Sequence, residues 1–167
     1  MANDKLEILS SLPVHGTPTS DPTAHELRID GLVRESITLH STDLASLPRA
    51  EVTDDFICRE GWCVPGLHWE GVSLATVLDL AGADPEGAFV QVSSADFSTP
   101  LSRADAERAL LATDLGGDPL AREHGGPVRL LVPGADCYTS VKWVDHIEVR
   151  SAPGKDTAQA IALARLK

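Results

Sequence analysis

The sequence predicts an α+β fold in which a mixed β-sheet is combined with short helices, and three observations lead to this prediction. Apolar and polar residues alternate over Glu26–Val33, as in a half-buried strand. Apolar residues between Ser73 and Gly82 recur at helical spacing, with Ser73 as a suitable N-cap and Gly82 as a suitable C-terminal glycine. Strands and short helices follow one another without repeated βαβ units of the usual length, which favours a mixed sheet.

The other elements follow from local signals. Ser41 or Thr42 is expected to cap a short helix that Pro48 ends, because the residue before a proline avoids helical geometry. Ser102 is expected to cap a second helix that runs to Leu111. A tight hairpin turn is expected at Gly116–Gly117, and further strands at Ile37–Leu39, Val52–Cys58, Ala88–Val92, Val128–Val132, Val141–Val144 and His146–Val149.

The 167 residues are enough for one domain with a real core. We expect this domain to occupy residues 25–150. Residues 1–24 are rich in proline, threonine and serine and are expected to be irregular. Residues 151–167 are expected to form a helical tail, because small and apolar residues fall on one face of Asp156–Lys167.

Composition narrows the classes of partner. With 14 basic and 25 acidic residues the formal charge is −11, which disfavours nucleic acid and anionic membrane, since both require clustered lysine and arginine. No segment approaches the roughly 20 apolar residues that span a bilayer. Three cysteines do not suggest a disulfide framework, and the first residues have no apolar core of signal-peptide length. A cytoplasmic protein with reduced thiols is therefore expected.

The segment Phe56–Val72, FICREGWCVPGLHWEGV, is expected to contain the end of a strand at Cys58, after which the chain turns irregularly through Gly61, Pro65 and Gly66. Such loops commonly carry functional groups, and the positive charge of Arg59 would favour the Cys58 thiolate. Three alternatives remain open. Cys58 can be an inert buried thiol or can form a disulfide switch with Cys63, and a zinc site with Cys63 and His68 would lack a fourth ligand.

A second group of polar residues surrounds the strand near residue 130. His124 precedes two glycines, Arg129 lies within the strand, and Lys142 follows a second glycine-containing turn at Gly134. Taken singly, these cations are ordinary surface charges. Taken together, they predict an anion cradle in which the glycines allow close approach of the main chain, arginine supplies a fork and lysine a point charge.

These motifs occur together in one known family. In chain order they read LRIDGLV, CREGW, VPGLHWEGV, SSAD, HGGPVR followed by VPG, and SVKW, and they extend from about Leu27 to Val149. The combination resembles the sulfite-oxidase-type molybdopterin-binding domain. The resemblance implies that family's α+β fold and molybdopterin, the molybdenum cofactor, as the bound group.

The resemblance also implies roles for individual residues. Cys58 would be the thiolate ligand of molybdenum, and Glu60 matches the acidic residue of the family's C-x-E motif, so both are expected to be catalytic. His124, Arg129 and Lys142 would contact the pterin and its phosphate. The remaining expected cofactor-binding residues are Arg59, Gly134 and Tyr138.

The implied activity is oxygen-atom transfer on a small substrate of sulfur- or nitrogen-oxide type, with a separate electron-transfer partner. Two positions depart from the family pattern. Cys137 stands where relatives commonly carry glycine, and Phe97 is the nearest counterpart of a tyrosine near the metal. They motivate an alternative hypothesis, a molybdopterin-binding or carrier domain without catalysis.

Overall fold

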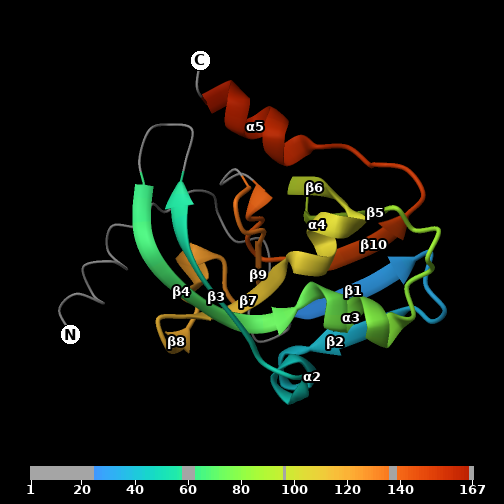
Figure 1. The fold of residues 1–167 in the computed structure, drawn as a ribbon, viewed down its shortest axis with the longest axis horizontal. Helices are drawn as coiled ribbons and strands as arrows, with labels where there is room; N and C mark the ends of the chain where they lie inside the picture. Colours follow the sequence, from blue (N-terminus) through green and yellow to red (C-terminus); the bar gives the residue numbers. More distant parts are fainter. Residues whose placement is uncertain (1–24, 58–62, 96, 136–138, 166–167) are drawn as a thin grey trace.

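The computed structural model describes residues 25–57, 63–95, 97–135 and 139–165. Within these residues the chain folds into two β-sheets accompanied by short helices (Figure 1). The α+β class with a mixed sheet is confirmed. No helix in these ranges is long and apolar enough to cross a membrane.

The first sheet has the strand order β2-β1-β10-β5-β6. Its pairs are antiparallel except β1 with β10, which run parallel and bring the start and the end of the expected domain side by side. Leu27, Ile29, Ile147 and Val149 alternate with polar residues and are buried, so one face of this pair packs on the core. The strand bounds are β1 Glu26–Gly31, β2 Ile37–His40, β5 Phe89–Ser94, β6 Phe97–Ser102 and β10 His146–Arg150.

The second sheet has the order β3-β4-β7-β8, and β9 pairs with β7. All these pairs are antiparallel, and the β7–β8 turn confirms the expected Gly116–Gly117 hairpin. In Figure 1 the long, curved β3–β4 hairpin stands at one side of the molecule. The strand bounds are β3 Ala50–Ile57, β4 Cys63–Ser73, β7 Leu110–Leu115, β8 Asp118–Pro119 and β9 Arg129–Leu131.

The expectation of irregular structure at Pro65 and Gly66 is wrong, because both residues lie in strand β4, whereas Gly61 lies outside the described residues. Leu67 and Trp69 are buried, and the residues between and beyond them are half-buried, which is the alternation of a strand. The proline and glycine that suggested a loop lie at an irregularity of the β3–β4 register. There Gly66 has φ +65° and donates its N–H to Oδ1 of Asp55 at 2.9 Å.

The helices are α2 (Ser41–Ser46), α3 (Leu74–Ala81), α4 (Arg103–Arg108) and α5 (Thr157–Arg165). Helix α3 is as expected, and Gly82 ends it with φ +70°. Helix α4 begins after Ser102, whose Oγ accepts from Asp105 N at 3.2 Å, but it stops at Arg108. The predicted extension to Leu111 is wrong because Leu110 and Leu111 are buried in β7.

The cap expected for α2 is also different. His40, rather than Ser41 or Thr42, is the N-cap residue, and its N–H donates to Oδ2 of Asp43 at 2.8 Å. The acidic side chain in the first turn therefore supplies the stabilising contact. The helix still ends just before Pro48, as predicted.

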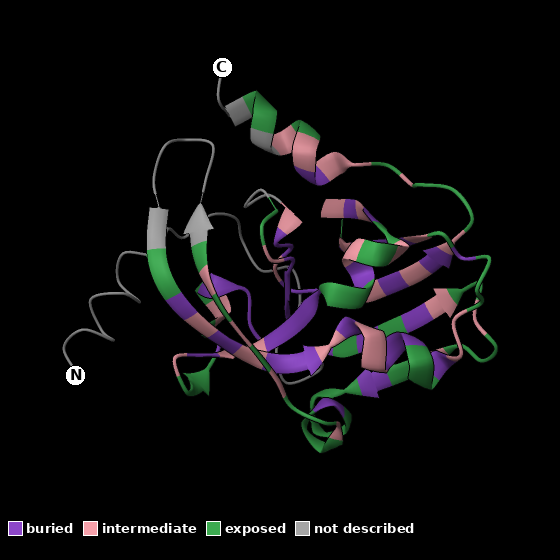
Figure 2. Ribbon diagram, in the orientation of Figure 1, coloured by how far each residue is buried: buried purple, intermediate pink, exposed green. Residues whose placement is uncertain are grey.

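The core lies chiefly between the first sheet, α3 and the inner strands of the second sheet, where buried residues gather (Figure 2). A smaller cluster includes Leu67, Trp69 and Leu131. The tail is held by the first sheet: Gln91 Nε2 donates to Lys155 O at 2.6 Å, and Ser98 N donates to Thr157 Oγ1 at 2.8 Å. The predicted C-terminal helix is confirmed as α5.

Candidate cofactor site

A short 3-10 helix, η2 (Arg122–His124), forms one side of the site. Gly125 ends it with φ +109°, a left-handed conformation that glycine adopts without strain. The chain then enters β9, which confirms the strand expected at Val128–Val132 and places Arg129 at its start. The glycines of the HGGP motif thus turn the chain so that His124 and Arg129 approach each other.

The predicted strand at Val141–Val144 is wrong. The main chain of this segment does bond to its neighbours, since Leu130 N donates to Val141 O and Val144 N donates to Val128 O, both at 2.9 Å. Trp143 lies between these bonds with φ +53°, which interrupts an extended strand. This local reversal brings Lys142 and Trp143 against η2.

Arg129 is a buried cation, with 4% of its surface exposed. Its Nε donates to Ser140 O at 3.3 Å and a terminal nitrogen donates to His124 O at 2.9 Å. Its guanidinium carbon lies 5.6 Å from the centre of the Trp69 ring. Carbonyl dipoles and a ring face reduce the cost of burying this charge.

Lys142 supplies a second cation from the other side of the turn. Its Nζ donates to Glu123 O at 2.8 Å and lies 5.5 Å from the centre of the Trp143 ring. The side chain is half-buried. Arg129 and Lys142 therefore bring two positive charges to the two sides of η2.

His124 completes the group and is neutral at neutral pH. Burial lowers the pKa of its imidazole, Glu123 opposes this shift, and the positive charges of Lys142 and Arg129 lower the pKa further. The residue is 7% exposed, and its Nδ1 has no hydrogen-bond partner among the residues that the structure describes. A buried polar atom in this state is available to a ligand.

Gly125 fixes the spacing of these side chains. A Cβ atom built on it would lie 2.9 Å from Cγ of Lys142 and 3.1 Å from Cδ of Arg129. Glycine thus lets both cationic side chains pack directly on the main chain of the turn. The structure brings together three residues expected to bind the cofactor, namely His124, Arg129 and Lys142.

Gly134, another expected residue, lies in the exposed turn after β9 with φ +79°. Its N–H donates to Oδ2 of Asp54 on β3 at 3.3 Å. This contact connects the VPG turn with the strand that leads to residue 58. Cys58, Arg59, Glu60 and Tyr138 lie outside the described residues, as does Cys137, and their predicted roles remain predictions.

Sequence reasoning missed two contributors to this region. Trp143 donates its indole N–H to Arg122 O at 2.7 Å, and Trp69 lies beneath Arg129. The SVKW motif drew attention to Lys142, but a hydrogen bond from the following indole to a main-chain carbonyl leaves no periodic signal. Phe97 begins β6, is half-buried, and packs against the core.

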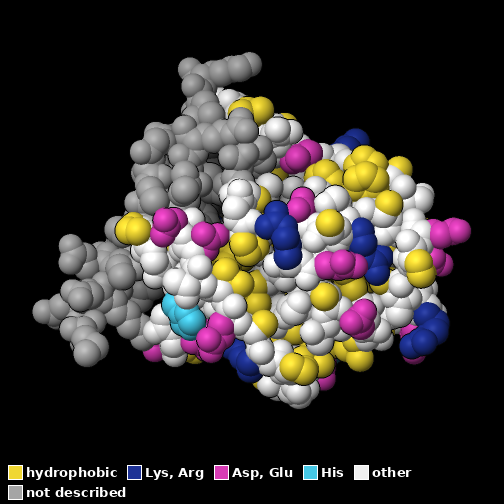
Figure 3. Space-filling model, viewed as in Figure 1, with side chains coloured by type: hydrophobic (Ala, Val, Ile, Leu, Met, Phe, Trp, Pro, Cys, Tyr) yellow, Lys and Arg dark blue, Asp and Glu magenta, His cyan; other side chains and the backbone are white. Residues whose placement is uncertain are grey.

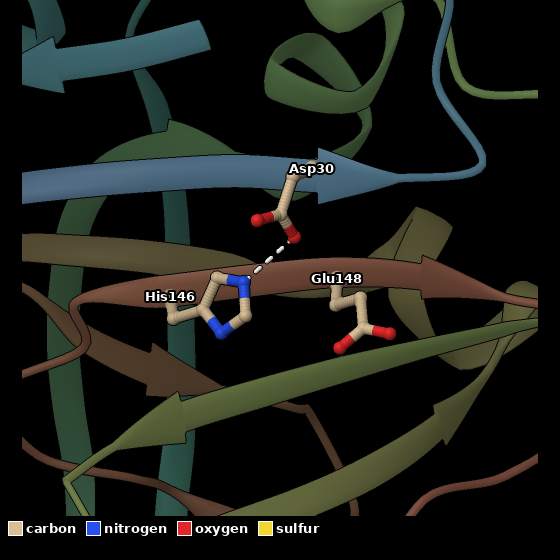
Figure 4. A group of neighbouring side chains, drawn as sticks. All are labelled: Asp30, His146 and Glu148. Atoms are coloured by element: carbon tan, nitrogen blue, oxygen red, sulfur yellow. Dashed lines mark hydrogen bonds and ion pairs between the residues drawn. The ribbon is translucent and has the colours of Figure 1, made fainter. Parts of the chain in front are cut away.

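Other groups of potential metal ligands are explained by ion pairing. Asp30 from β1 and His146 and Glu148 from β10 lie together in Figure 4, with His146 Nε2 2.7 Å from Asp30 Oδ1. Arg28 pairs with Asp30 at 3.2 Å and Arg150 with Glu148 at 2.9 Å, so both carboxylates already have counter-ions.

The histidine considered for zinc lies on β4. Nδ1 of His68 is 2.9 Å from Thr53 Oγ1, and its Nε2 is 3.4 Å from Glu70 and 3.8 Å from Glu51. These contacts explain the position of the His68 ring without a metal ion, as part of the polar surface of the β3–β4 pair. On the face shown in Figure 3, acidic and basic side chains are interspersed, and its described part shows no concentrated basic patch.

A groove of about 540 Å³ lies beside α2, between residues that include Leu44, Arg49, Asp114 and Pro127. None of His124, Arg129 and Lys142 lines this groove. The cationic group is therefore a separate feature of the fold, formed by a turn, a strand and a following loop.

The fold is a two-sheet α+β domain, and the structure gathers His124, Arg129 and Lys142 around one turn. The chain belongs to the family described as the oxidoreductase molybdopterin binding domain, whose model matches residues 14–158. The family expected from the sequence motifs is confirmed.

The chain is similar in sequence or in fold to three proteins of known sequence or structure. The chain is 33% identical to the uncharacterized oxidoreductase YuiH of Bacillus subtilis (strain 168) over 77% of this chain and 66% of the relative. It is 31% identical to mitochondrial sulfite oxidase of Homo sapiens over 83% of this chain and 31% of that protein. The crystal structure of the sulfane dehydrogenase SoxCD from Paracoccus pantotrophus has a TM-score of 0.75 at 26% identity and covers 83% of this chain and 41% of that one. The chain thus spans less than two thirds of these proteins.

The family is one of oxidoreductases and its cofactor is molybdopterin. The described residues fit this group: two buried or half-buried cations suit a phosphate, His124 Nδ1 is available to a polar ligand, and Gly125 lets both cationic side chains pack on the same turn. The expectation of molybdopterin, based on the motifs, is confirmed.

Proposed function

We propose that this protein is a molybdopterin-dependent oxidoreductase that transfers an oxygen atom to or from a small sulfur- or nitrogen-oxide-type substrate. The observation that carries the proposal is the convergence of His124, Arg129 and Lys142 around the end of η2. Such a group suits an anionic, hydrogen-bonding ligand, and the family's cofactor is one.

The roles of the chain's own residues follow from their chemistry. Arg129 and Lys142 hold the phosphate, arginine through its fork and lysine through a point charge. His124, neutral and with Nδ1 available, exchanges a hydrogen bond with the pterin. We assign Cys58 as the metal ligand and Glu60 as the acidic residue beside it, with Arg59 favouring the thiolate and Gly134 and Tyr138 adjoining the cofactor. Bound molybdenum supplies the redox chemistry.

The names of the relatives indicate which class of substrate to test first. The names of two of them, sulfite oxidase and sulfane dehydrogenase, refer to sulfur compounds. A sulfur-centred oxo acceptor or donor is therefore the first choice here. Electrons are exchanged with a separate carrier protein, and the odd number of thiols favours the cytoplasm as the location.

The test compares Cys58→Ala with Cys63→Ala, because Cys63 pairs in the strand register with Ile57, the residue that precedes Cys58 in the sequence. Both proteins are produced in a host that makes molybdopterin. Cys58→Ala is expected to lose sulfite or sulfoxide turnover with a dye as electron partner, together with the thiolate-to-metal absorption, whereas Cys63→Ala keeps both. Full activity in Cys58→Ala would refute the proposal.

The alternative, a molybdopterin-binding or carrier domain without catalysis, is favoured by Phe97, which packs on the core and has no hydroxyl. Tight retention of the cofactor without redox cycling by any dye would establish this alternative. A Cys58–Cys63 switch would instead appear as a reversible disulfide in protein that takes up no metal.

A further inference from the structure

Three consecutive carbonyl groups of η2 are bound by three side chains from elsewhere in the chain. Trp143 Nε1 donates to Arg122 O at 2.7 Å, Lys142 Nζ to Glu123 O at 2.8 Å, and Arg129 to His124 O at 2.9 Å. Arg122 O also accepts from Gly125 N at 3.1 Å, and a carbonyl oxygen has two lone pairs, so it can accept a second donor. Both cations of the site therefore take their positions from the orientation of this one turn.

Trp143 holds the turn at two points. Besides its indole bond to Arg122 O, its main-chain N–H donates to Gly125 O at 3.1 Å, so it spans the turn from its first residue to the glycine that ends it. Trp143 has φ +53°, in the left-handed region that a non-glycine residue seldom adopts. It is also 8% exposed, and its ring lies under the ammonium of Lys142. A strained conformation is kept where surrounding contacts require it.

We propose that Trp143 is a positioning residue for the anion site, one that fixes η2 through its indole N–H and thereby sets the two carbonyls that hold Lys142 and Arg129. The inference rests on the proposed function, since the anion in question is the phosphate of the cofactor. Trp143 itself need not touch the ligand. Its bond to Arg122 O orients the peptide groups that follow, and these carry the acceptors for both cations.

If Trp143 only filled space, another aromatic side chain could replace it without weakening anion binding. Trp143→Phe keeps an aromatic ring under Lys142 and removes the indole donor, so it separates packing from positioning. Loss of one directed hydrogen bond is expected to weaken anion binding by roughly tenfold. The experiment uses the full chain free of cofactor and inorganic pyrophosphate as the probe, with affinity measured by calorimetry.

A second readout reports on the cations directly. The pKa of His124 is lowered by burial and by Lys142 and Arg129, with Glu123 acting in the opposite direction. If the turn loosens and Lys142 moves away, the pKa of His124 rises, which NMR titration of its imidazole detects. A purely structural role for Trp143 would lower the melting temperature and leave this titration where it is.

Val77→Ala is the matched control, because Val77 is fully buried in α3 and its loss destabilises the core without changing a contact of η2. We expect this control to leave pyrophosphate affinity and the His124 titration unchanged. Equal effects in Val77→Ala and Trp143→Phe, or no effect in Trp143→Phe, would overturn the inference. Wild-type protein that binds no pyrophosphate would also overturn it.

These outcomes are distinguishable from failure of the proposed function. Wild-type protein that binds pyrophosphate, with weaker binding in Trp143→Phe, supports the inference even if no redox turnover is found. Conversely, turnover that depends on Cys58, combined with unchanged pyrophosphate binding in Trp143→Phe, supports the proposed function and refutes the role of Trp143.

Discussion

At the scale of single residues, the site depends on how a buried positive charge is stabilised. Arg129 donates to two main-chain carbonyls, which fix the direction of its guanidinium. A lysine has the same charge but cannot span two acceptors with a rigid fork. The geometry of Arg129, and not its charge alone, is thus what the site requires.

Arg129→Lys is therefore expected to reduce the retained molybdopterin by roughly tenfold, although the net charge is unchanged. Retention is measured as molybdenum and released pterin per chain. Arg103→Lys is the matched control, since Arg103 also donates to two carbonyls, Asp84 O at 3.1 Å and Gly87 O at 3.0 Å. Equal retention in Arg129→Lys and wild type would contradict the assignment of Arg129.

The buried imidazole of His124 makes the stability of the cofactor-free protein depend on pH. Because its folded-state pKa lies below the unfolded value of 6.5, the unfolded chain takes up a proton first as the pH falls. The stability from neutral His124 is present above pH 6.5 and is lost as the pH falls towards the folded pKa. His124→Gln should show a smaller loss of unfolding free energy between pH 7.5 and the acidic range in urea titrations. The same loss as in wild type would show that other groups cause it.

At the scale of elements, the η2–Gly125 turn is the part of the candidate site that a small change at one glycine should disrupt. A methyl group on Gly125 meets both Lys142 and Arg129, and the residue has φ +109°. Gly66 has φ +65° with no atom within 4 Å of a built Cβ. The two glycines separate the cost of backbone conformation from the cost of crowding.

Gly66→Ala should lower the unfolding free energy by about 1–2 kcal/mol, the cost of the left-handed conformation alone. Gly125→Ala should lower the unfolding free energy by about 1–3 kcal/mol more than Gly66→Ala does, because the added methyl group is crowded. This variant should also lose cofactor. Thermal unfolding and molybdenum content measure both effects. If the two variants behave alike, the close packing of Lys142 and Arg129 on Gly125 is not important.

Elements with local signals were predictable from the sequence. Helix α3 has helical spacing between Ser73 and Gly82, and no tertiary contact was needed to expect it. Strand β4 was missed because Pro65 and Gly66 are typical of a loop. In the structure both residues lie within the strand, at an irregularity of its register with β3. A strand at Val141–Val144 was expected from apolar residues, but the positive φ of Trp143 depends on contacts with η2.

The candidate site likewise contains some residues that the sequence could predict and others that it could not. His124, Arg129 and Lys142 could be proposed because residue type and motif order identify them, and the structure places them around one turn. The indole bond of Trp143 and the ring of Trp69 beneath Arg129 could not, because each joins residues that are distant in sequence. Pairings of this kind arise from sheet topology, which brings β4 next to β7 and β7 next to β9.

At the scale of the whole molecule, the tail beyond β10 is attached to the first sheet at some distance in sequence from the site. Gln91 on β5 donates to Lys155 O at 2.6 Å and accepts from Gly154 N at 3.1 Å. A Cβ on Gly154 would lie 2.5 Å from Oε1 of Gln91, so the tail passes close over this amide. Gln91 thus secures residues 151–165 to the domain.

Gln91→Ala should release this segment at a cost of about 1–3 kcal/mol, the range for unpaired buried polar groups. Hydrogen exchange of the Gly154 amide measures the release, and cofactor content should not change. Glu107→Ala, in an exposed position of α4, serves as the control. Unchanged protection of Gly154 in Gln91→Ala would show that other contacts hold the tail.

The measurement that tests the account most directly is the molybdenum and pterin content of protein made in a host that synthesises molybdopterin. Wild type is compared with Lys142→Met and with Lys155→Met, which removes an exposed lysine outside the site. We predict about one molybdenum per chain in wild type and Lys155→Met, and a loss of roughly tenfold in Lys142→Met. Wild-type protein without molybdenum, or equal content in all three proteins, would contradict the claim that this turn holds the cofactor.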